Sequence, residues 1–248
     1  MLKESSSQFQ LSQWILIDSL TPVGETFEQR VAVYSTLGDP FRLAMVDDLR
    51  MSDRSPTELA VRHRLSSNLL AHHLDVLESV GLISRGVSAG DARRRYVRLD
   101  HARLNAVAVM PALAVTPQPE MVFLCTHNSA RSQLAAALWI HRTGGQARSA
   151  GTHPAPQIHQ MAREAGVRRG LDLTSARPQL LDAVQTQPQD SQTSVQVVTV
   201  CDRVHEDLNA EPGWWHWSIP DPVEAGTEAA FDAVITELDL RIDALLHR

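Results

Sequence analysis

The sequence predicts an α/β protein in two parts. The first part shows apolar residues at helical spacing, followed by two short stretches that can pair as a β-hairpin. The second part alternates apolar strands with helices, which is typical of a three-layer α/β/α domain with a small parallel sheet. A proline-containing stretch separates them. We therefore expect an extension over residues 1–25, a first domain over 26–115, a linker over 116–119 and a second domain over 120–248.

The composition bounds the class of protein. The 248 residues carry a formal net charge of −6 and 43% of them are hydrophobic. No apolar run approaches the ~18 residues that cross a membrane. The first ten residues lack the cationic start and apolar core of a secretory signal, and the chain has two cysteines. We expect a cytoplasmic protein with free thiols, no membrane contact and no disulfide framework.

The first part reads as four helices and a hairpin. The helices are expected over residues 25–37, 41–49, 59–64 and 67–80, and the strands over 82–87 and 93–99. Two short helices joined by a tight turn, followed by an arginine-rich hairpin, form a winged helix-turn-helix. In such a module the second helix enters the major groove of DNA and the hairpin, called the wing, contacts phosphates.

Three segments carry a family resemblance: LGDPFRL at 37–43, LSSNLLAHHLDVLESVGLI at 65–83 and RRRYVRL at 93–99. They resemble the arsenical-resistance repressor (ArsR) type of winged-helix regulator, which implies transcription regulation, a homodimer and double-stranded DNA as a partner. A protein-only interaction module is the alternative. The expected DNA-binding residues are Ser66, Ser67, Asn68, Ala71, His72, Arg93, Arg94 and Arg95.

A metal site is not expected in the first part. Many regulators of this type sense soft metals through cysteines in the helix that here reads ELAVRHR, residues 58–64, which has none. Lone helix histidines are more often in contact with solvent or DNA. We apply that interpretation to His63, His72, His73 and His101.

The second part places both cysteines after apolar strands. Strands are expected over 121–124, 147–150 and 195–200, and helices over 133–141, around 158–165, and at the carboxyl end. Reactive groups in parallel sheets lie beyond the carboxyl ends of the strands, which is where Cys125 and Cys201 fall. The last helix is expected to bury Phe231, Val234, Ile235, Leu238, Ile242 and Leu245.

The segment MVFLCTHNSARS, residues 121–132, has the pattern of an anion-binding loop. An apolar strand ends at Cys125, and a short polar loop leads into an Ala/Leu-rich helix, so the loop amides surround one point. The helix start stabilises the Cys125 thiolate, and Arg131 can offer two parallel N–H groups to an oxyanion. Ser132 can hydrogen-bond the sulfur. The intervening amides come from Thr126, His127, Asn128, Ser129 and Ala130.

Four motifs of the second part occur together: FLCTHNSARSQLAAAL, RSAGTHPAP, VVTVCD and HWSIPDP. They resemble the arsenate reductases built on the low-molecular-weight tyrosine phosphatase fold. The resemblance implies that Cys125 is the nucleophile, Asn128 holds the loop in its strained shape and Asp221 is the general acid. It also implies that Cys201 is a second thiol that resolves an arsenic adduct by forming a disulfide. Arsenate would be the substrate, with phosphate as a competitor.

Two departures from that pattern leave alternatives open. Tyrosine phosphatases of this fold usually follow the Asp-Pro pair with tyrosines, whereas this chain has Val223, Glu224 and Ala225, which favours the reductase over a protein tyrosine phosphatase. A third cysteine, common in thioredoxin-coupled reductases, is replaced by Leu208. With no bound cofactor, an external thiol would reset Cys125, either thioredoxin or a low-molecular-weight thiol with its redoxin. Cys201 could instead be a small buried residue, and the second domain an oxyanion or redox sensor.

Overall fold

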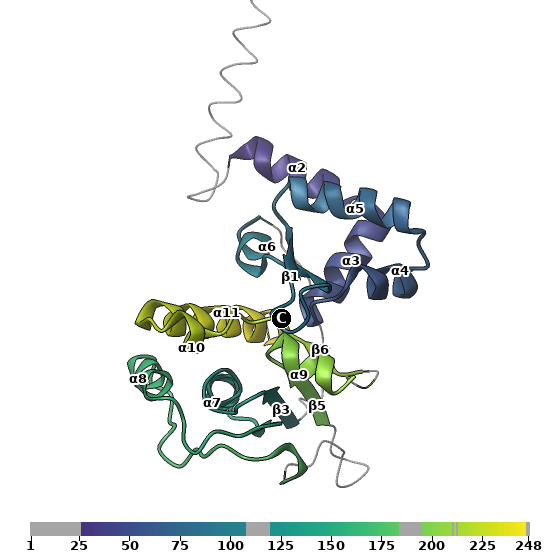
Figure 1. The fold of residues 1–248 in the computed structure, drawn as a ribbon. Coiled ribbons are helices and arrows are strands. Elements are labelled where there is room, and N and C mark those ends of the chain that lie inside the picture. The colour runs from purple at the N-terminus through teal and green to yellow at the C-terminus, as the bar shows by residue number, and fades with distance from the viewer. Residues whose placement is uncertain (1–25, 108–119, 184–194, 210, 212, 247–248) are drawn as a thin grey trace, which may run out of the picture.

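The structure is a computed structural model that describes residues 26–107, 120–183, 195–209, 211 and 213–246 (Figure 1). The expected extension over 1–25 and the linker over 116–119 lie outside these residues. So do residues 108–115 of the expected first domain. Among the described residues, no helix is long and apolar enough to span a bilayer.

The first part contains the expected helices and hairpin. The helices are α2 (Phe27–Leu37), α3 (Pro40–Met51), α4 (Pro56–His63) and α5 (Ser67–Ser79). The strands β1 (Ile83–Val87) and β2 (Arg95–Leu99) pair antiparallel, and α6 (His101–Val107) follows.

Local capping sets where these helices begin. The Thr26 side chain and Gln29 form a capping box at the start of α2, and Ser55 and Glu58 form another before α4. The Asp39 carboxylate accepts from two amides at the start of α3. β2 starts two residues later than expected because the Arg94 amide donates to the Asp91 carbonyl at 2.8 Å, which keeps Arg94 in the turn.

A separate apolar core stabilises the first part. It gathers Leu70, Leu74 and Leu77 of α5 with residues of the other helices and the hairpin. The expectation of solvent or DNA contact is wrong for His73 and His101, which are buried. Burial lowers the pKa of His101 to about 3, because an imidazolium would lose its hydration there. His72 is exposed, as expected.

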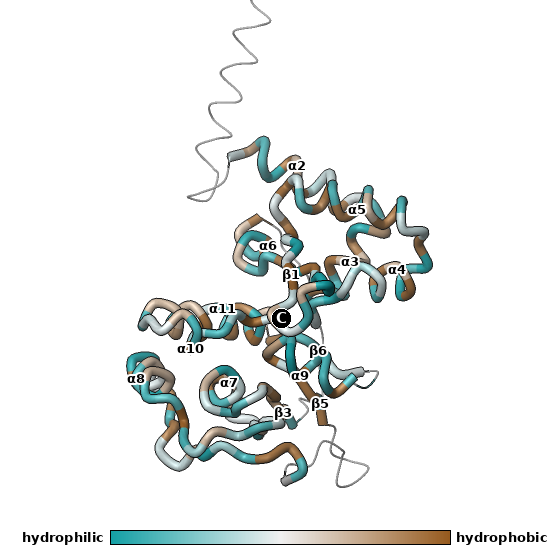
Figure 2. Tube along the Cα trace, viewed as in Figure 1, coloured by the Kyte–Doolittle hydropathy of each residue, from teal (hydrophilic) through white to brown (hydrophobic). Residues whose placement is uncertain are grey.

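The second part is built on a four-stranded sheet in the order β4-β3-β5-β6. All neighbouring strands are parallel, which confirms an α/β part with a parallel sheet. Figure 2 shows β5 as an apolar segment beside β3, as expected of a central strand buried on both faces. The strands are β3 (Glu120–Cys125), β4 (Ala147–Gly151), β5 (Val195–Thr199) and β6 (Trp215–His216).

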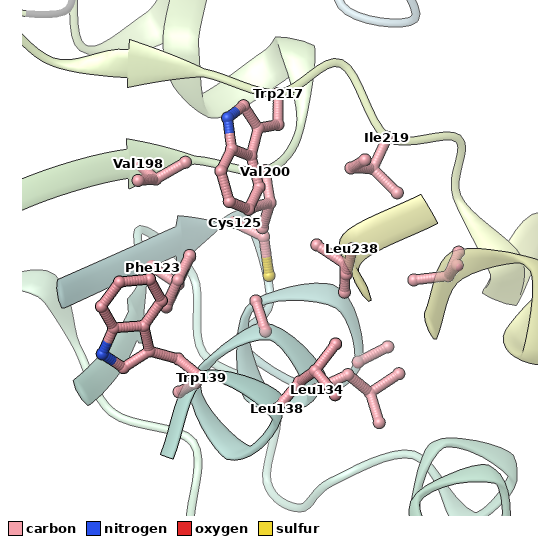
Figure 3. Close-up of a cluster of buried hydrophobic side chains, with 14 of the residues drawn as sticks. Phe123, Cys125, Leu134, Leu138, Trp139, Val198, Val200, Trp217, Ile219 and Leu238 are labelled. Atoms are coloured by element: carbon pink, nitrogen blue, oxygen red, sulfur yellow. The ribbon is translucent and has the colours of Figure 1, made fainter. Parts of the chain in front are cut away.

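Helices complete the second core. The described helices are α7 (Arg131–Thr143), α8 (Gln160–Arg168), α9 (Asp202–Asp207), α10 (Pro222–Ala225) and α11 (Glu228–Leu246), with a short 3-10 helix at Leu181–Ala183. The six apolar residues expected on the inner face of α11 are all buried. Figure 3 shows Cys125 within this apolar cluster, which also includes Trp139 and Trp217.

The two parts share a polar, buried interface. Helix α11 contacts α7 and α8 of its own part and also α3 and α6 of the first part (Figure 1). Arg241 of α11 pairs with Asp53 at 3.1 Å, and both side chains are almost completely buried. The Ser218 amide donates to the other Asp53 oxygen at 2.6 Å. Residues next to α3 therefore support the segment that leads to Asp221.

Candidate active site

The loop after β3 has its carbonyl groups turned outward. The carbonyls of Thr126, His127 and Ser129 accept hydrogen bonds at 2.9 Å from the amides of His153, Ala155 and His159, respectively. Within the described part of the chain, the amides of residues 127–130 have no such partner. Because these amides precede the first turn of α7, the loop can present a ring of N–H groups to an anion.

Asn128 maintains this loop shape. Its backbone has a φ of 46°, in the left-handed region that asparagine tolerates better than most residues. Its side chain is completely buried and accepts from the Gln179 amide at 2.8 Å and from Gln133 Nε2 at 3.0 Å. The end of the neighbouring strand β4 also comes close to this loop. A Cβ on Gly151 would lie 2.6 Å from the Thr126 carbonyl oxygen. Glycine is therefore needed at that position.

Ser132 is placed to donate to the Cys125 sulfur. Its Oγ lies 3.0 Å from Cys125 Sγ and accepts from Asn128 Nδ2 at 2.7 Å. Since the amide of Asn128 supplies one proton to that oxygen, the hydroxyl's own proton is free to point at the sulfur. The sulfur of Cys125 therefore lies next to a hydroxyl donor in the first turn of α7.

Arg131 and Asp221 meet at the rim of the loop. Arg131 Nη2 donates to Asp221 Oδ2 at 2.5 Å, and its Nη1 donates to the Ile219 carbonyl at 3.0 Å. The other carboxylate oxygen of Asp221 accepts from the Val223 amide at 3.0 Å, where it caps α10. An oxyanion that binds Arg131 bidentately has to share this guanidinium with Asp221.

Cys201 lies at the end of the neighbouring strand β5, in a different environment. It directly precedes the short helix α9 without a side-chain capping hydrogen bond, and its Sγ is 3.6 Å from Thr126 Oγ1. Burial, and then the negative charge of Cys125, raise the pKa of the Cys201 thiol above its usual range. The second thiol is therefore held protonated beside the first.

A cavity of about 180 Å³ brings these groups together. Both cysteines, Arg131 and Asp221 line it, along with most of the loop, Asp202, Arg203, Val223, Glu224 and, from the first part, Ala89. Asn128 and Ser132, behind the loop, do not line it. The expected DNA-binding residues are elsewhere, all exposed, on α5 and its preceding turn and on the hairpin.

Sequence reasoning did not identify several contributors to this site, among them Gly151, Gln133 and Ala89. Gly151 and Gln133 lie within motifs that were recognised, so their proximity to the loop could have been suspected. Ala89 has no such signal, because a small residue in a hairpin turn carries no chemistry of its own. Among the described residues, no group of three histidine, cysteine or acidic side chains is placed to hold a metal ion.

A buried cysteine at the start of a helix, amides and an arginine around it, and an aspartate at the rim define a class: thiol enzymes that attack tetrahedral oxyanions or their esters. Residues 120–248, just over half of the chain, match the family model of the low molecular weight phosphotyrosine protein phosphatases. The chain belongs to this family.

Solved structures similar to the chain have different named activities. An arsenate reductase from Archaeoglobus fulgidus is 27% identical, with 51% of this chain and 98% of that chain covered and a TM-score of 0.42. The tyrosine phosphatase AmsI from Erwinia amylovora is 19% identical, with 51% and 90% covered and a TM-score of 0.42. The arginine phosphatase YwlE from Geobacillus stearothermophilus is 22% identical, with 51% and 90% covered and a TM-score of 0.41.

Proposed function

We propose that the second part is a thiol-dependent arsenate reductase. The observation that carries this proposal is that Cys125 and Cys201 line one cavity. Ester hydrolysis through Cys125 needs a single thiol, whereas reduction of arsenic(V) by the protein needs two electrons, which two thiols can supply by forming a disulfide.

The proposed reaction begins with the Cys125 thiolate. The sulfur attacks arsenic, Asp221 gives a proton to the departing oxygen, and water leaves. Cys201 then passes its proton to an oxygen on arsenic and attacks the Cys125 sulfur. The sulfur–sulfur bond forms, the sulfur–arsenic bond breaks, and its electron pair stays on arsenic, which leaves as arsenite. The disulfide is then reduced by an external thiol system, either thioredoxin or a redoxin with a low-molecular-weight thiol. Such a system is available in the reducing cytoplasm, where we propose that the protein acts.

The test compares wild type with Cys125→Ser and Cys201→Ser. We expect wild type to convert arsenate to arsenite with either thiol system, and both variants to lose that conversion. Cys201→Ser should still hydrolyse p-nitrophenyl phosphate, because Cys125, Arg131 and Asp221 are intact. Arsenite formation by Cys201→Ser at the wild-type rate would contradict the role of the second thiol.

The second candidate is a phosphatase, and the observation that favours it is the pairing of Asp221 with Arg131 beside Cys125. These three groups suffice for phosphate ester hydrolysis. The same preparations distinguish the two candidates. Rapid turnover of p-nitrophenyl phosphate with no arsenite formed under any thiol system would establish the phosphatase and reject the reductase.

We also propose that the first part is an ArsR-type winged helix-turn-helix that binds double-stranded DNA as a homodimer. The support is a polar, exposed face on α5 and the exposed arginines Arg93, Arg94 and Arg95. A dimer contact through α2 and α3 is favoured by the exposed apolar residues on these helices, which are Val31, Tyr34, Phe41 and Leu43.

The DNA proposal is tested by fluorescence anisotropy with duplexes selected from a random pool, and by light scattering for the dimer. We expect Arg94→Ala to weaken binding to all duplexes and to lower the slope against log salt by about 0.9 per lost phosphate contact. Arg168→Ala, an exposed arginine on α8, is the matched control. Equal effects of the two substitutions would contradict DNA binding by the wing. Repeating the measurement with arsenate tests the alternative that the second part is a sensor.

A further inference from the structure

The turn of the amino-terminal hairpin, residues 88–91, lies against helix α9 of the second part. The Ala89 amide donates to Asp202 Oδ2 at 2.7 Å, and the Ser88 hydroxyl donates to Glu206 Oε1 at 2.6 Å. The Tyr96 hydroxyl donates to the same Glu206 oxygen at 3.2 Å. Two carboxylates of α9 therefore hold a turn that comes from more than a hundred residues earlier in the chain.

The fit between the turn and α9 is close. A Cβ on Gly90 would lie 3.0 Å from the backbone nitrogen of Arg203, tighter than ordinary van der Waals contact. Burial alone would raise the pKa of Asp202, but hydrogen bonds from His216, Ser218 and the Ala89 amide outweigh it and lower that pKa well below its usual range. Asp202 therefore stays an anion that accepts from the turn.

This contact lies at the cavity that holds the thiols. Asp202 directly follows Cys201, and Ala89, Arg203, Val223 and Glu224 all line the same 180 Å³ cavity. Pockets that enclose drug-sized ligands measure about 300–1,000 Å³, so this space suits a much smaller molecule.

We propose that the turn is a specificity-determining wall of the active site, with Ala89 as its contacting residue. It narrows the access to Cys125 so that compact inorganic oxyanions enter, and phosphate esters carried on protein side chains are excluded. The proposal rests on the oxyanion chemistry proposed above for Cys125. It adds that the first part of the chain, whatever else it binds, selects the substrate.

The test measures access to Cys125 directly, so its result does not depend on which reaction the enzyme performs. Alkylation of Cys125 in the full chain is followed by peptide mass spectrometry with two reagents, compact iodoacetamide and bulky iodoacetamidofluorescein. Glu206→Ala removes the acceptor for Ser88 and Tyr96, whereas Glu206→Gln keeps an acceptor and is the matched control. Ala89→Trp adds bulk to the wall and provides the opposite change.

We expect wild type and Glu206→Gln to react much faster with the compact reagent than with the bulky one. The rate with the compact reagent divided by the rate with the bulky reagent should fall about tenfold in Glu206→Ala, because hydrogen bonds to a charged group are lost. The same ratio should rise in Ala89→Trp. The rate of hydrolysis of a phosphotyrosyl peptide relative to that of acetyl phosphate should rise in Glu206→Ala and fall in Ala89→Trp. The same ratio of alkylation rates in all four proteins would overturn the proposal. If the ratios are as expected but wild type does not reduce arsenate, only the proposed reductase function is rejected.

Discussion

The ends of β3 and β5 are neighbours in one sheet, yet the surroundings of their cysteines differ. Cys125 at the end of β3 is followed by a loop of free amides and the 13-residue helix α7. Cys201 at the end of β5 is followed by the six-residue helix α9, whose acidic residues bind the other part of the chain. The comparison teaches that similar positions in a parallel sheet can place one thiol before a loop of amides without backbone partners, and another, with a pKa raised by burial, beside the first part of the chain.

The largest effect is expected at the β3 end. Asp221→Asn removes the proposed acid but keeps an acceptor for the helix cap, so it should lower hydrolysis of p-nitrophenyl phosphate by about 10²–10⁴-fold. Glu224→Gln, which lines the same cavity, should stay near wild type. If both variants lose activity equally, Asp221 has no special role as the acid.

At the β5 end, the next effect is on stability in acid. Burial, and then His216 stacked at 4.1 Å, lower the pKa of His205 to about 3. Because the unfolded chain takes up this proton near pH 6.5, stability should fall as the pH drops from about 6.5 to about 3, by a few kcal/mol. Urea unfolding of His205→Gln should show a shallower loss over that window. An unchanged pH profile would mean that His205 titrates normally in the folded protein.

A smaller effect on the nucleophile alone is expected from Ser132→Ala. A hydrogen bond to a charged group contributes about 1.5–3 kcal/mol, so alkylation of Cys125 by iodoacetamide at neutral pH should slow by about 10–100-fold. Cys201 should keep its rate in this variant. Ser129→Ala is the control, because Ser129 lines the cavity without any hydroxyl contact to Cys125. Slowing of both cysteines would mean that the substitution disturbs the whole loop.

The smallest effect concerns Cys201 in alkali. Its pKa is raised in the folded protein, so the unfolded chain loses the proton first, from about pH 8.5. Stability should therefore decline as the pH rises above about 8.5, by at most about 1.4 kcal/mol per pH unit. Cys201→Ala should flatten this decline, as measured by urea unfolding at each pH. Identical slopes would show that Cys201 ionises as readily in the fold as outside it.

The β3 end could be predicted from sequence because its information is local. An apolar strand, a polar loop and a helix lie within about 20 consecutive residues, and the parallel sheet follows from the alternation of strands and helices. Helices α9 and α10 and strand β6 were not predicted, since six, four and two residues are too few to show a period. Helix α8 begins at Gln160, whereas the sequence predicts a start at about Ile158.

Contacts between the two parts could not be predicted. Ala89 and Asp202 are an ordinary turn residue and an ordinary acidic residue, and no pattern links positions so far apart in the chain. Asp53 and Arg241 look like surface charges in the sequence but are buried against each other. Only the three-dimensional fold reveals that these groups are partners.

The buried Asp53–Arg241 pair ties the thermal behaviour of the two parts together. Each part has its own apolar core, and separate cores could in principle melt one after the other. Unfolding either part alone would break this buried pair, and removing one partner of a buried ion pair typically costs about 3–5 kcal/mol. We therefore expect the two parts to unfold together in a single cooperative thermal transition.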